Sequence, residues 1–311
     1  MKVLQDNSLP PKDAAMPAYN GTPNNNMLGI LYICAAMLMM SSMDAFGKWL
    51  VEAEYNVFQI LFIRSCINFC ILFSLMPFLG GLQLIKTKRF GAHAVRGLLG
   101  FIAPALFFTS LQSLELAEAT VIFFVAPFIM TALSVPLFKE KVGIHRWGAI
   151  LLGFAGVIYV IQPSSSIFNP AAFFVLGASL CYSIMMLASR WLGQTDKTFT
   201  IVFFVTFWTG ISTGFVAPFF WKPIPFEHVL VVGGMALLSL AGNFFIVKAF
   251  TIGEVGVITP FEYSSLIWAL SIGYLVFGEV PKDHVWIGMT IILASGLYMV
   301  YRENKKRPAI E

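Results

Sequence analysis

The sequence predicts an all-α integral membrane protein with ten transmembrane helices, arranged as two inverted five-helix repeats. Three observations predict it: a shortage of charge, a series of long apolar segments, and an internal repeat. Of the 311 residues, 58% are hydrophobic and 12% are charged, whereas soluble domains carry about 25% charged residues. The mean hydropathy is +0.79. A chain with so few polar side chains cannot cover a water-soluble core, so its surroundings must be lipid.

The apolar segments have the length that a bilayer requires. A hydrocarbon core about 30 Å thick needs about 20 apolar residues for each crossing helix. Short connections that contain Gly, Pro and charged residues separate the segments and leave no room for a soluble domain. The expected spans are residues 28–50, 57–79, 95–114, 117–138, 146–162, 171–190, 198–220, 229–250, 254–277 and 284–301.

Two polar ends flank these spans. Residues 1–26 are rich in Asn, Pro and Ala and lack the basic start and apolar centre of a signal peptide. We therefore expect them to form a disordered cytoplasmic tail, and residues 303–311 to form a second, basic cytoplasmic tail. Between the tails, residues 27–163 are the expected first repeat and residues 164–302 the expected second.

The distribution of Lys and Arg predicts the orientation, because loops rich in these residues stay in the cytoplasm. With the N-terminus inside, external loops carry only Lys222 and Lys282, and the spans contain Lys48, Arg64 and Lys248. The sequence thus predicts a multi-pass protein of the cell inner (cytoplasmic) membrane, with both termini cytoplasmic. The basic residues assigned to the cytoplasm are Lys2, Lys12, Lys86, Lys88, Arg89, Arg96, Lys139, Lys141, Arg146, Arg190, Lys197, Arg302, Lys305, Lys306 and Arg307.

The internal repeat appears when residues 96–122 are aligned with residues 232–258 and the match is continued after a short insertion. Because each unit has five spans, an odd number, the second unit lies inverted relative to the first. Inverted repeats are typical of secondary transporters, whose halves can exchange conformations around a site near the midplane. Aligned residues include Glu118 with Glu254, Glu140 with Glu279, and Lys48-Trp49-Leu50 with Arg190-Trp191-Leu192.

The chain resembles the EamA-type branch of the drug/metabolite transporter superfamily. This resemblance implies a ten-helix carrier that moves small organic metabolites without ATP, among them amino acids, riboflavin-like vitamins, S-adenosylmethionine-like compounds and organic anions. The motifs that carry the resemblance are Phe62-Ile63-Arg64, Leu116-Ala117-Glu118-Ala119, Pro127, Glu140, Phe261-Glu262-Tyr263 and Phe277-Gly278-Glu279.

Ionisable residues inside a span are candidate substrate-binding residues, because each costs about 2.5–3.5 kcal/mol to insert at the helix centre. Arg64 offers a planar fork of donors that suits a carboxylate or a phosphate. Glu262, just after Pro260, could bind a substrate amine or carry a coupling proton. The alternatives are structural: a fixed partner for Arg64, and an ion pair of Glu262 with Lys248 or Arg64.

Further residues complete the candidate site. Tyr263 and Trp268 could form an aromatic wall, with Trp208 or Tyr182 as additional flanking residues. Lys48 could bind substrate, pair with Asp44 one turn away, or extend to the membrane interface. Lys248 could bind substrate or extend to the membrane interface, whereas Asn243 and Gln112 are candidate hydrogen-bonding residues. Arg96 and Arg190 are expected at span ends, as interfacial charges.

Motifs for other chemistry are missing from the sequence. It contains no HExxH, GxSxG, GxxxxGK[ST] or GxGxxG pattern. Cys34, Cys66, Cys70 and Cys181 are expected as buried apolar thiols, since Cys66 and Cys70 alone provide too few ligands for zinc. We therefore expect no metal, no cofactor, no nucleic-acid partner and no enzymatic activity.

The sequence predicts a secondary active transporter that moves a small metabolite by alternating access. Its partners would be the substrate, a coupling proton and membrane lipids. Three basic residues in the spans against Asp44 and Glu262 favour a zwitterionic or anionic solute. The alternatives are a lipid-modifying membrane enzyme, which needs a polar catalytic cluster at one interface, and a channel, which needs no inverted repeat. The substrate, the direction of transport, the coupling ion and the oligomeric state are not specified by the sequence.

Overall fold

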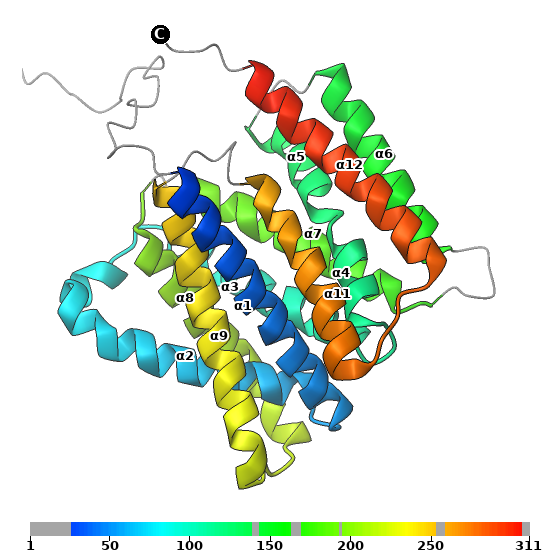
Figure 1. Ribbon diagram of the computed structural model, residues 1–311. Coiled ribbons are helices and arrows are strands. Elements are labelled where there is room, and N and C mark those ends of the chain that lie inside the picture. The colour runs from blue at the N-terminus through cyan, green and yellow to red at the C-terminus, as the bar shows by residue number, and fades with distance from the viewer. Residues whose placement is uncertain (1–25, 139–142, 163–168, 193–194, 253–258, 307–311) are drawn as a thin grey trace, which may run out of the picture.

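The computed structural model describes residues 26–138, 143–162, 169–192, 195–252 and 259–306. Within these residues the chain is helical, with no strand (Figure 1). The helices are α1 (Asn26–Glu52), α2 (Val57–Leu79), η1 (Gly81–Ile85), α3 (Phe90–Ser110), α4 (Leu116–Phe123), α5 (Ala126–Phe138), α6 (Ile144–Ile161), α7 (Ala172–Leu192), α8 (Thr198–Val216), η2 (Ala217–Phe220), α9 (Phe226–Ile252), η3 (Thr259–Tyr263), α11 (Ser264–Phe277) and α12 (Asp283–Lys306).

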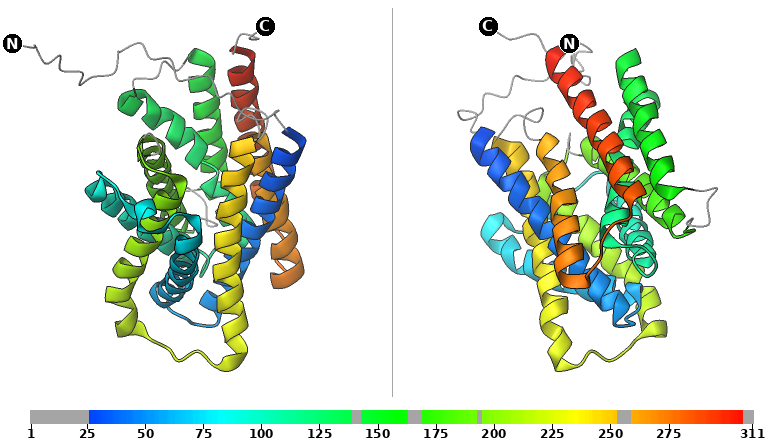
Figure 2. Two further views of the ribbon diagram at one scale, coloured as in Figure 1. Left: turned by 90° about the vertical axis from the view of Figure 1, so that its left-hand side faces the viewer. Right: turned by 45° about the vertical axis from the view of Figure 1, so that its right-hand side comes forward.

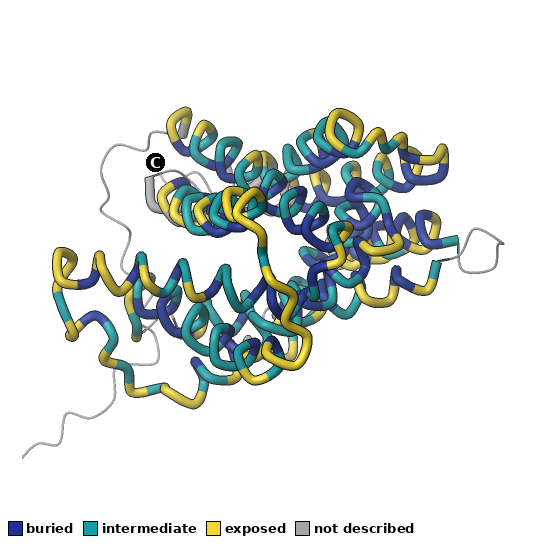
Figure 3. The backbone as a smooth tube through the Cα atoms, turned by 90° about the horizontal axis from the view of Figure 1, so that it is seen from below, coloured by how far each residue is buried: buried dark blue, intermediate teal, exposed yellow. Residues whose placement is uncertain are grey.

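The outer surface of this bundle is apolar. Within the described residues, seven helices are long and apolar enough to cross a membrane, and two shorter apolar helices cover Trp147–Ile161 and Phe261–Phe277. Large apolar side chains project from the perimeter, with Phe226 91% and Phe78 87% exposed. Viewed along the bundle, the buried positions lie between the helices and the exposed ones surround them (Figure 3). These features confirm a multi-pass helical membrane protein.

Helical segments occupy each expected span, with differences at the ends. The span expected at residues 117–138 is interrupted at Phe124 and Val125, which divide it into α4 and α5. The third helix begins at Phe90 rather than at residue 95, so Arg96 lies inside α3 and is buried. The helix α12 extends to Lys306, into the segment expected to be a tail. The expected tails at 1–25 and 307–311 lie outside the described residues.

Local sequence explains several helix ends. The Asn56 side chain accepts a hydrogen bond from the Phe58 backbone N–H at 2.9 Å and thereby caps the N-terminus of α2. Gly278 ends α11 with φ +68°, a left-handed conformation that glycine adopts without a steric penalty. Directly after it comes Glu279, whose position proves important for the packing of the two halves.

The helices associate in pairs drawn from opposite halves of the sequence. The first helix, α1, lies along α9, and α3 lies along α7. Similarly, α2 contacts α8, while α6 and α12 form a pair at one side of the bundle (Figures 1 and 2). The start of α1 and the end of α12 lie at the same end of the bundle (Figure 1). The core is therefore built from contacts between the halves rather than within either half.

Small residues permit the closest of these contacts. A Cβ on Gly288 of α12 would lie 2.1 Å from Val160 Cγ2 and 3.0 Å from the Gly156 carbonyl oxygen of α6. A Cβ on Gly214 of α8 would lie 2.9 Å from the Phe62 ring of α2. In lipid, such close approach supplies much of the association energy between helices. The glycines thus serve packing within the chain.

We expect Gly288→Ala to destabilise the protein by about 1–3 kcal/mol, because the added methyl group collides with Val160 and with backbone. The measurement is thermal unfolding of the purified protein in detergent. Gly148→Ala on α6 is the matched control, since nothing lies within 4 Å of its Cβ position. Equal melting temperatures for the two variants would contradict the packing of α6 on α12.

Candidate functional site

Two helices are interrupted in the interior of the bundle, and the first interruption separates α4 from α5. A broken helix exposes carbonyl oxygens that lipid cannot satisfy. Ser179 and Ser183, both fully buried on α7, lie beside it: Ser179 Oγ is 3.3 Å from the Phe123 carbonyl oxygen and Ser183 Oγ is 3.1 Å from that of Ala126. Each hydroxyl is closer to a carbonyl oxygen of α7 itself, that of Val175 at 2.8 Å for Ser179 and that of Ser179 at 2.6 Å for Ser183, so its single proton is shared between the two helices. The interruption thus faces two hydroxyl groups of the neighbouring helix.

The second irregular segment is the 3₁₀ turn η3, which leads directly into α11. Here Ser41 Oγ of α1 donates to the Ser265 carbonyl oxygen at 3.3 Å, and Ser265 Oγ donates to that of Glu262 at 2.9 Å. The Tyr263 ring at the end of η3 stacks on the Phe124 ring at the end of α4, with centroids 5.0 Å apart and planes at 24°. The two interruptions therefore meet in the interior.

Glu262 lies at this meeting point and is half-buried. Its carboxylate interacts electrostatically with the hydroxyls of Tyr182 on α7 and Tyr263. Among the described residues, no basic side chain lies within 4 Å of it. The expected alternative, an ion pair with Lys248 or Arg64, is thus not seen in the part of the chain that the structure describes. A carboxylate so placed can accept a cation or a proton.

Arg96 approaches the same region from α3. It interacts electrostatically with Tyr182, donates from Nε to Ser189 Oγ at 2.6 Å, and donates from Nη1 to the Ile201 carbonyl oxygen at 3.1 Å. We had expected Arg96 to be an interfacial charge. The repeat alignment includes Arg96 but carries no information on its burial. The contacts with α7 and α8 show that the side chain is buried.

Arg64 lies across the interior on α2, where it is half-buried. It interacts electrostatically with Asp44 of α1, and its Nη1 donates to Met43 Sδ at 3.7 Å. Asp44 is one helical turn from Ser41, which contacts the start of α11. The Asp44–Arg64 pair thus borders the Glu262 region, and the donor fork of Arg64 is not engaged by a close carboxylate within the described residues.

Aromatic side chains surround these charges. The Tyr182 ring contacts the Phe123 ring with centroids 5.2 Å apart. The indole N–H group of Trp268 on α11 is buried and has no hydrogen-bond partner among the described residues. Trp208 on α8, expected as a flanking residue, packs instead against Phe90 and Phe207. Tyr263 directs its hydroxyl toward Gly296 of α12, where a Cβ would lie only 1.7 Å away. The region can therefore stack on a planar or cationic group and donate hydrogen bonds to it.

Lys48 takes part in a separate cluster of contacts, outside the Glu262 region. It is buried, and its ammonium forms an ion pair with Glu279, whose other carboxylate oxygen accepts from the Leu116 backbone N–H at 3.0 Å. The Lys48 ammonium also lies 3.4 Å from the Leu114 carbonyl oxygen. Lys48 therefore neither pairs with Asp44 nor extends to the membrane interface, and both of these expectations are wrong. Lys48 joins α1 to the start of α4 through the residue that follows α11.

The remaining candidates lie at the surface. Lys248, Asn243 and Gln112 are exposed, and Asn243 donates to the Ser239 carbonyl oxygen of its own helix at 2.8 Å. Glu140 and Glu254 lie outside the described residues. Among the described residues, no group of three His, Cys, Asp or Glu side chains could hold a metal ion.

A family model described as the EamA-like transporter family matches the chain twice, over residues 27–162 and 169–302. A solved crystal structure aligns with a TM-score of 0.60 at 14% identity, covering 87% of this chain and 98% of its own length. That likeness shows the shared fold.

Named transporters are similar along nearly their whole length. The S-adenosylmethionine uptake transporter of Rickettsia prowazekii (strain Madrid E) is 25% identical over 281 residues, which cover 89% of this chain and 94% of that protein. The riboflavin transporter of Vibrio cholerae serotype O1 is 26% identical over 280 residues, which cover 87% of this chain and 94% of that protein.

The Lys48–Glu279 pair predicts a strong coupling in stability. Lys48→Met and Glu279→Gln should each destabilise the protein by about 3–5 kcal/mol, because each removes one partner of a buried ion pair. After Glu279→Gln, Lys48 keeps only the longer contact with the half-exposed Glu52 at 3.8 Å. The double variant should lose much less than the sum of the two single losses, as measured by thermal unfolding in detergent. Lys248→Met is the control at an exposed lysine and should melt near the unmodified protein. Additive losses would contradict the pair.

Proposed function

The chain belongs to the EamA-like transporter family and is a small-metabolite transporter, and we propose that it carries a zwitterionic solute by alternating access. The site lies where the two interrupted helices meet. In this proposal Glu262 holds the cationic group of the solute and Arg64 holds its carboxylate. The observation that carries the proposal is the half-buried Glu262 carboxylate, which has no basic partner among the described residues.

The balance of interior charge supports a zwitterion. Since Lys48 is compensated by Glu279 and Lys248 is exposed, the positive excess that the sequence suggested is not present around the site. Of the remaining interior charges, Arg64 interacts with Asp44, while Arg96 and Glu262 each interact with Tyr182. A solute with one cationic and one anionic group leaves this balance unchanged, whereas a simple anion or cation would leave a buried charge uncompensated.

The named relatives narrow the class of solute that we propose. Near neutral pH, S-adenosylmethionine carries a sulfonium, an ammonium, a carboxylate and an adenine ring, so it has one cationic group more than a simple zwitterion, and that second cation would need the aromatic faces in addition to Glu262. Riboflavin carries no fixed cation. Rings such as Tyr182, Tyr263 and Trp268 attract a sulfonium or ammonium group through their faces and could stack on adenine. We therefore propose an S-adenosylmethionine-like or amino-acid-like solute in preference to a flavin.

Alternating access requires two equivalent halves, and paired contacts support this arrangement. The spacing that relates Lys48 to Arg190 also relates Ser41 to Ser183, and the spacing that relates Glu140 to Glu279 also relates Ala126 to Ser265. The bond from Ser183 to the Ala126 carbonyl oxygen therefore has a counterpart in the bond from Ser41 to that of Ser265.

Contacts at the two ends of the bundle agree with this relation. His93, early in α3, lies 2.7 Å from Asp196 in the connection between α7 and α8. His228, early in α9, lies 2.7 Å from the Tyr55 hydroxyl in the connection between α1 and α2. Each half thus reaches the first connection of the other half. We propose ten spans in two inverted repeats, with both termini cytoplasmic in an inner membrane.

Counterflow is the direct test of this proposal. Proteoliposomes loaded with unlabelled S-adenosylmethionine should accumulate the labelled compound transiently and with saturation, which a channel cannot do. Methionine and riboflavin, offered as competitors, distinguish the solute classes. Turnover of lipid without counterflow would favour a membrane enzyme, and inhibition by riboflavin alone would overturn the preference for a zwitterion.

Arg64→Ala should lower uptake at limiting substrate by about tenfold or more, because a hydrogen bond to a charged group contributes about 1.5–3 kcal/mol. The uptake rate of Arg64→Lys should lie between those of Arg64→Ala and the unmodified protein, since lysine keeps the positive charge but lacks the planar fork of donors. Lys248→Ala, at an exposed basic residue, is the matched control, and size-exclusion profiles verify folding. Unchanged uptake by Arg64→Ala would contradict the assignment.

Glu262→Gln should abolish the response of uptake to an imposed pH gradient, if this carboxylate exchanges a proton with the solute. Initial uptake rates between pH 5.5 and roughly pH 8, a window around neutrality where side-chain protons exchange in carriers, provide the profile. Glu227→Gln changes an exposed carboxylate at the start of α9 and should leave the profile intact. A Glu262→Gln profile that matches the unmodified one would exclude coupling through Glu262.

A further inference from the structure

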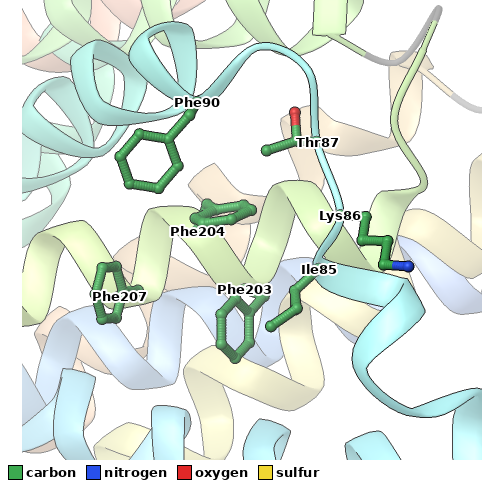
Figure 4. A pocket seen from close by; sticks show the side chains of 7 residues that line it. All are labelled: Ile85, Lys86, Thr87, Phe90, Phe203, Phe204 and Phe207. Carbon is green, nitrogen blue, oxygen red and sulfur yellow. The ribbon is translucent and has the colours of Figure 1, made fainter.

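A lateral pocket opens between η1, the start of α3 and α8, away from the interrupted helices. Its volume is about 530 Å³, within the range of small-molecule sites. The lining is almost entirely apolar: Ile85, Phe90, Phe203, Phe204 and Phe207 surround it, with Lys86 and Thr87 at its edge (Figure 4). This composition suits a hydrocarbon chain rather than a polar metabolite.

The pocket continues along the surface of the bundle. A second depression between α2 and α8 shares Phe207 with it and is lined by Phe62, Phe69 and the two glycines Gly210 and Gly214. The two together form an elongated apolar groove with one polar end. That shape matches a flexible chain attached to a headgroup.

The polar end carries basic charge. Lys86 and Lys88 are exposed beside the pocket, and no ion pair of either lysine occurs among the described residues. Arg89 stacks on the Trp191 ring, with its guanidinium carbon 4.0 Å from the centroid, and donates to the Trp191 carbonyl oxygen. Both lysine ammonium groups are therefore available to an anion at the mouth.

Asp196 is the nearby acid, and it is engaged elsewhere. Its Oδ2 accepts from Thr87 Oγ1 at 2.7 Å and lies 2.7 Å from His93 Nε2. Burial raises the pKa of Asp196, but the hydrogen bonds from His93 and Thr87 outweigh it and hold the pKa below the usual range. The carboxylate stays ionised, binds its own partners, and leaves the lysines to a different anion.

We propose that this groove binds an anionic phospholipid of the cytoplasmic leaflet. Its phosphate lies at Lys86 and Lys88, and one acyl chain lies against Phe90, Phe204 and Phe207. Basic sites between helices on the cytoplasmic side attract anionic headgroups in this way. The inference rests on the membrane setting and on the basic end of the bundle, and it is independent of the transported solute.

A titration of the full-length protein in detergent tests the proposal. Phosphatidylglycerol should raise the melting temperature in a saturable manner, and phosphatidylcholine with the same chains should not, because binding to the folded state stabilises it. Inorganic phosphate and glycerol 3-phosphate should produce no shift, since they lack the chain that fills the groove. Equal shifts with both lipids, or a shift with phosphate alone, would overturn the proposal.

Lys86→Gln should raise the half-saturating concentration of phosphatidylglycerol about fivefold, as expected for the loss of one basic group near a lipid surface. Lys282→Gln neutralises an exposed lysine at the opposite end of the bundle and is the matched control. Equal affinities for the two variants would exclude Lys86 from the site.

Fluorescence quenching locates the chain without relying on a charge variant. Trp208 borders the pocket, with its ring centroid 5.5 Å from that of Phe90 and 5.6 Å from that of Phe207. Phosphatidylglycerol with brominated chains should quench the unmodified protein more strongly than Trp208→Phe. Equal fractional quenching would place the lipid elsewhere, and a dimer whose contact protects Lys86 from amine labelling would assign the groove to a second copy of the chain.

Discussion

Hydrocarbon provides no hydrogen-bond partner for an open carbonyl oxygen, and this constraint determines where the fold can leave the helical path. The chain interrupts its helices where other protein segments supply the missing donors. Ser179 and Ser183 share their hydroxyl protons between their own helix and the break between α4 and α5, and Ser41 donates to the start of α11. Because these donors lie on α7 and α1, each break is maintained by a helix of the opposite half. Polar backbone is thereby concentrated in the interior, where a solute can use it.

The buried charges fall into two groups with different partners. The Lys48 ammonium and the Glu279 carboxylate satisfy each other and also engage the backbone at Leu114 and Leu116. Glu262, by contrast, has no basic side chain within 4 Å among the described residues and interacts electrostatically with Tyr182 and Tyr263. An ion pair with all of its partners in place holds helices together. A buried carboxylate without a basic partner can still gain interaction free energy when a cation binds to it. The number of polar partners, more than depth in the membrane, thus distinguishes the structural Lys48–Glu279 pair from the charge proposed to bind the solute.

The spans were predictable because they depend on local composition, but the partners of buried charges were not. Lys48 pairs with Glu279 across most of the chain, whereas the sequence favoured Asp44 because it lies one turn away. Arg96 lies near a predicted span end, and its burial depends on Ser189 and Ile201 from two other helices. The break at Phe124 was also missed, since both of its flanks are apolar and no glycine marks it. Arg64 and Glu262 were found because a charge inside a span is conspicuous by itself, and their roles in binding stay predictions.

The stack of Phe124 on Tyr263 has a consequence for the proposed exchange of conformations. The spacing that relates Glu140 to Glu279 also relates these two residues, so each ring faces its own counterpart. The proposed exchange of roles between the halves would convert this contact into itself, whereas it would convert a contact between residues that are not counterparts into a different one. The two rings can therefore stay in contact throughout the proposed transport cycle and form the pivot of the movement. Mutations at this point would alter the inward-facing and outward-facing states equally, and would change the rate of turnover without biasing its direction.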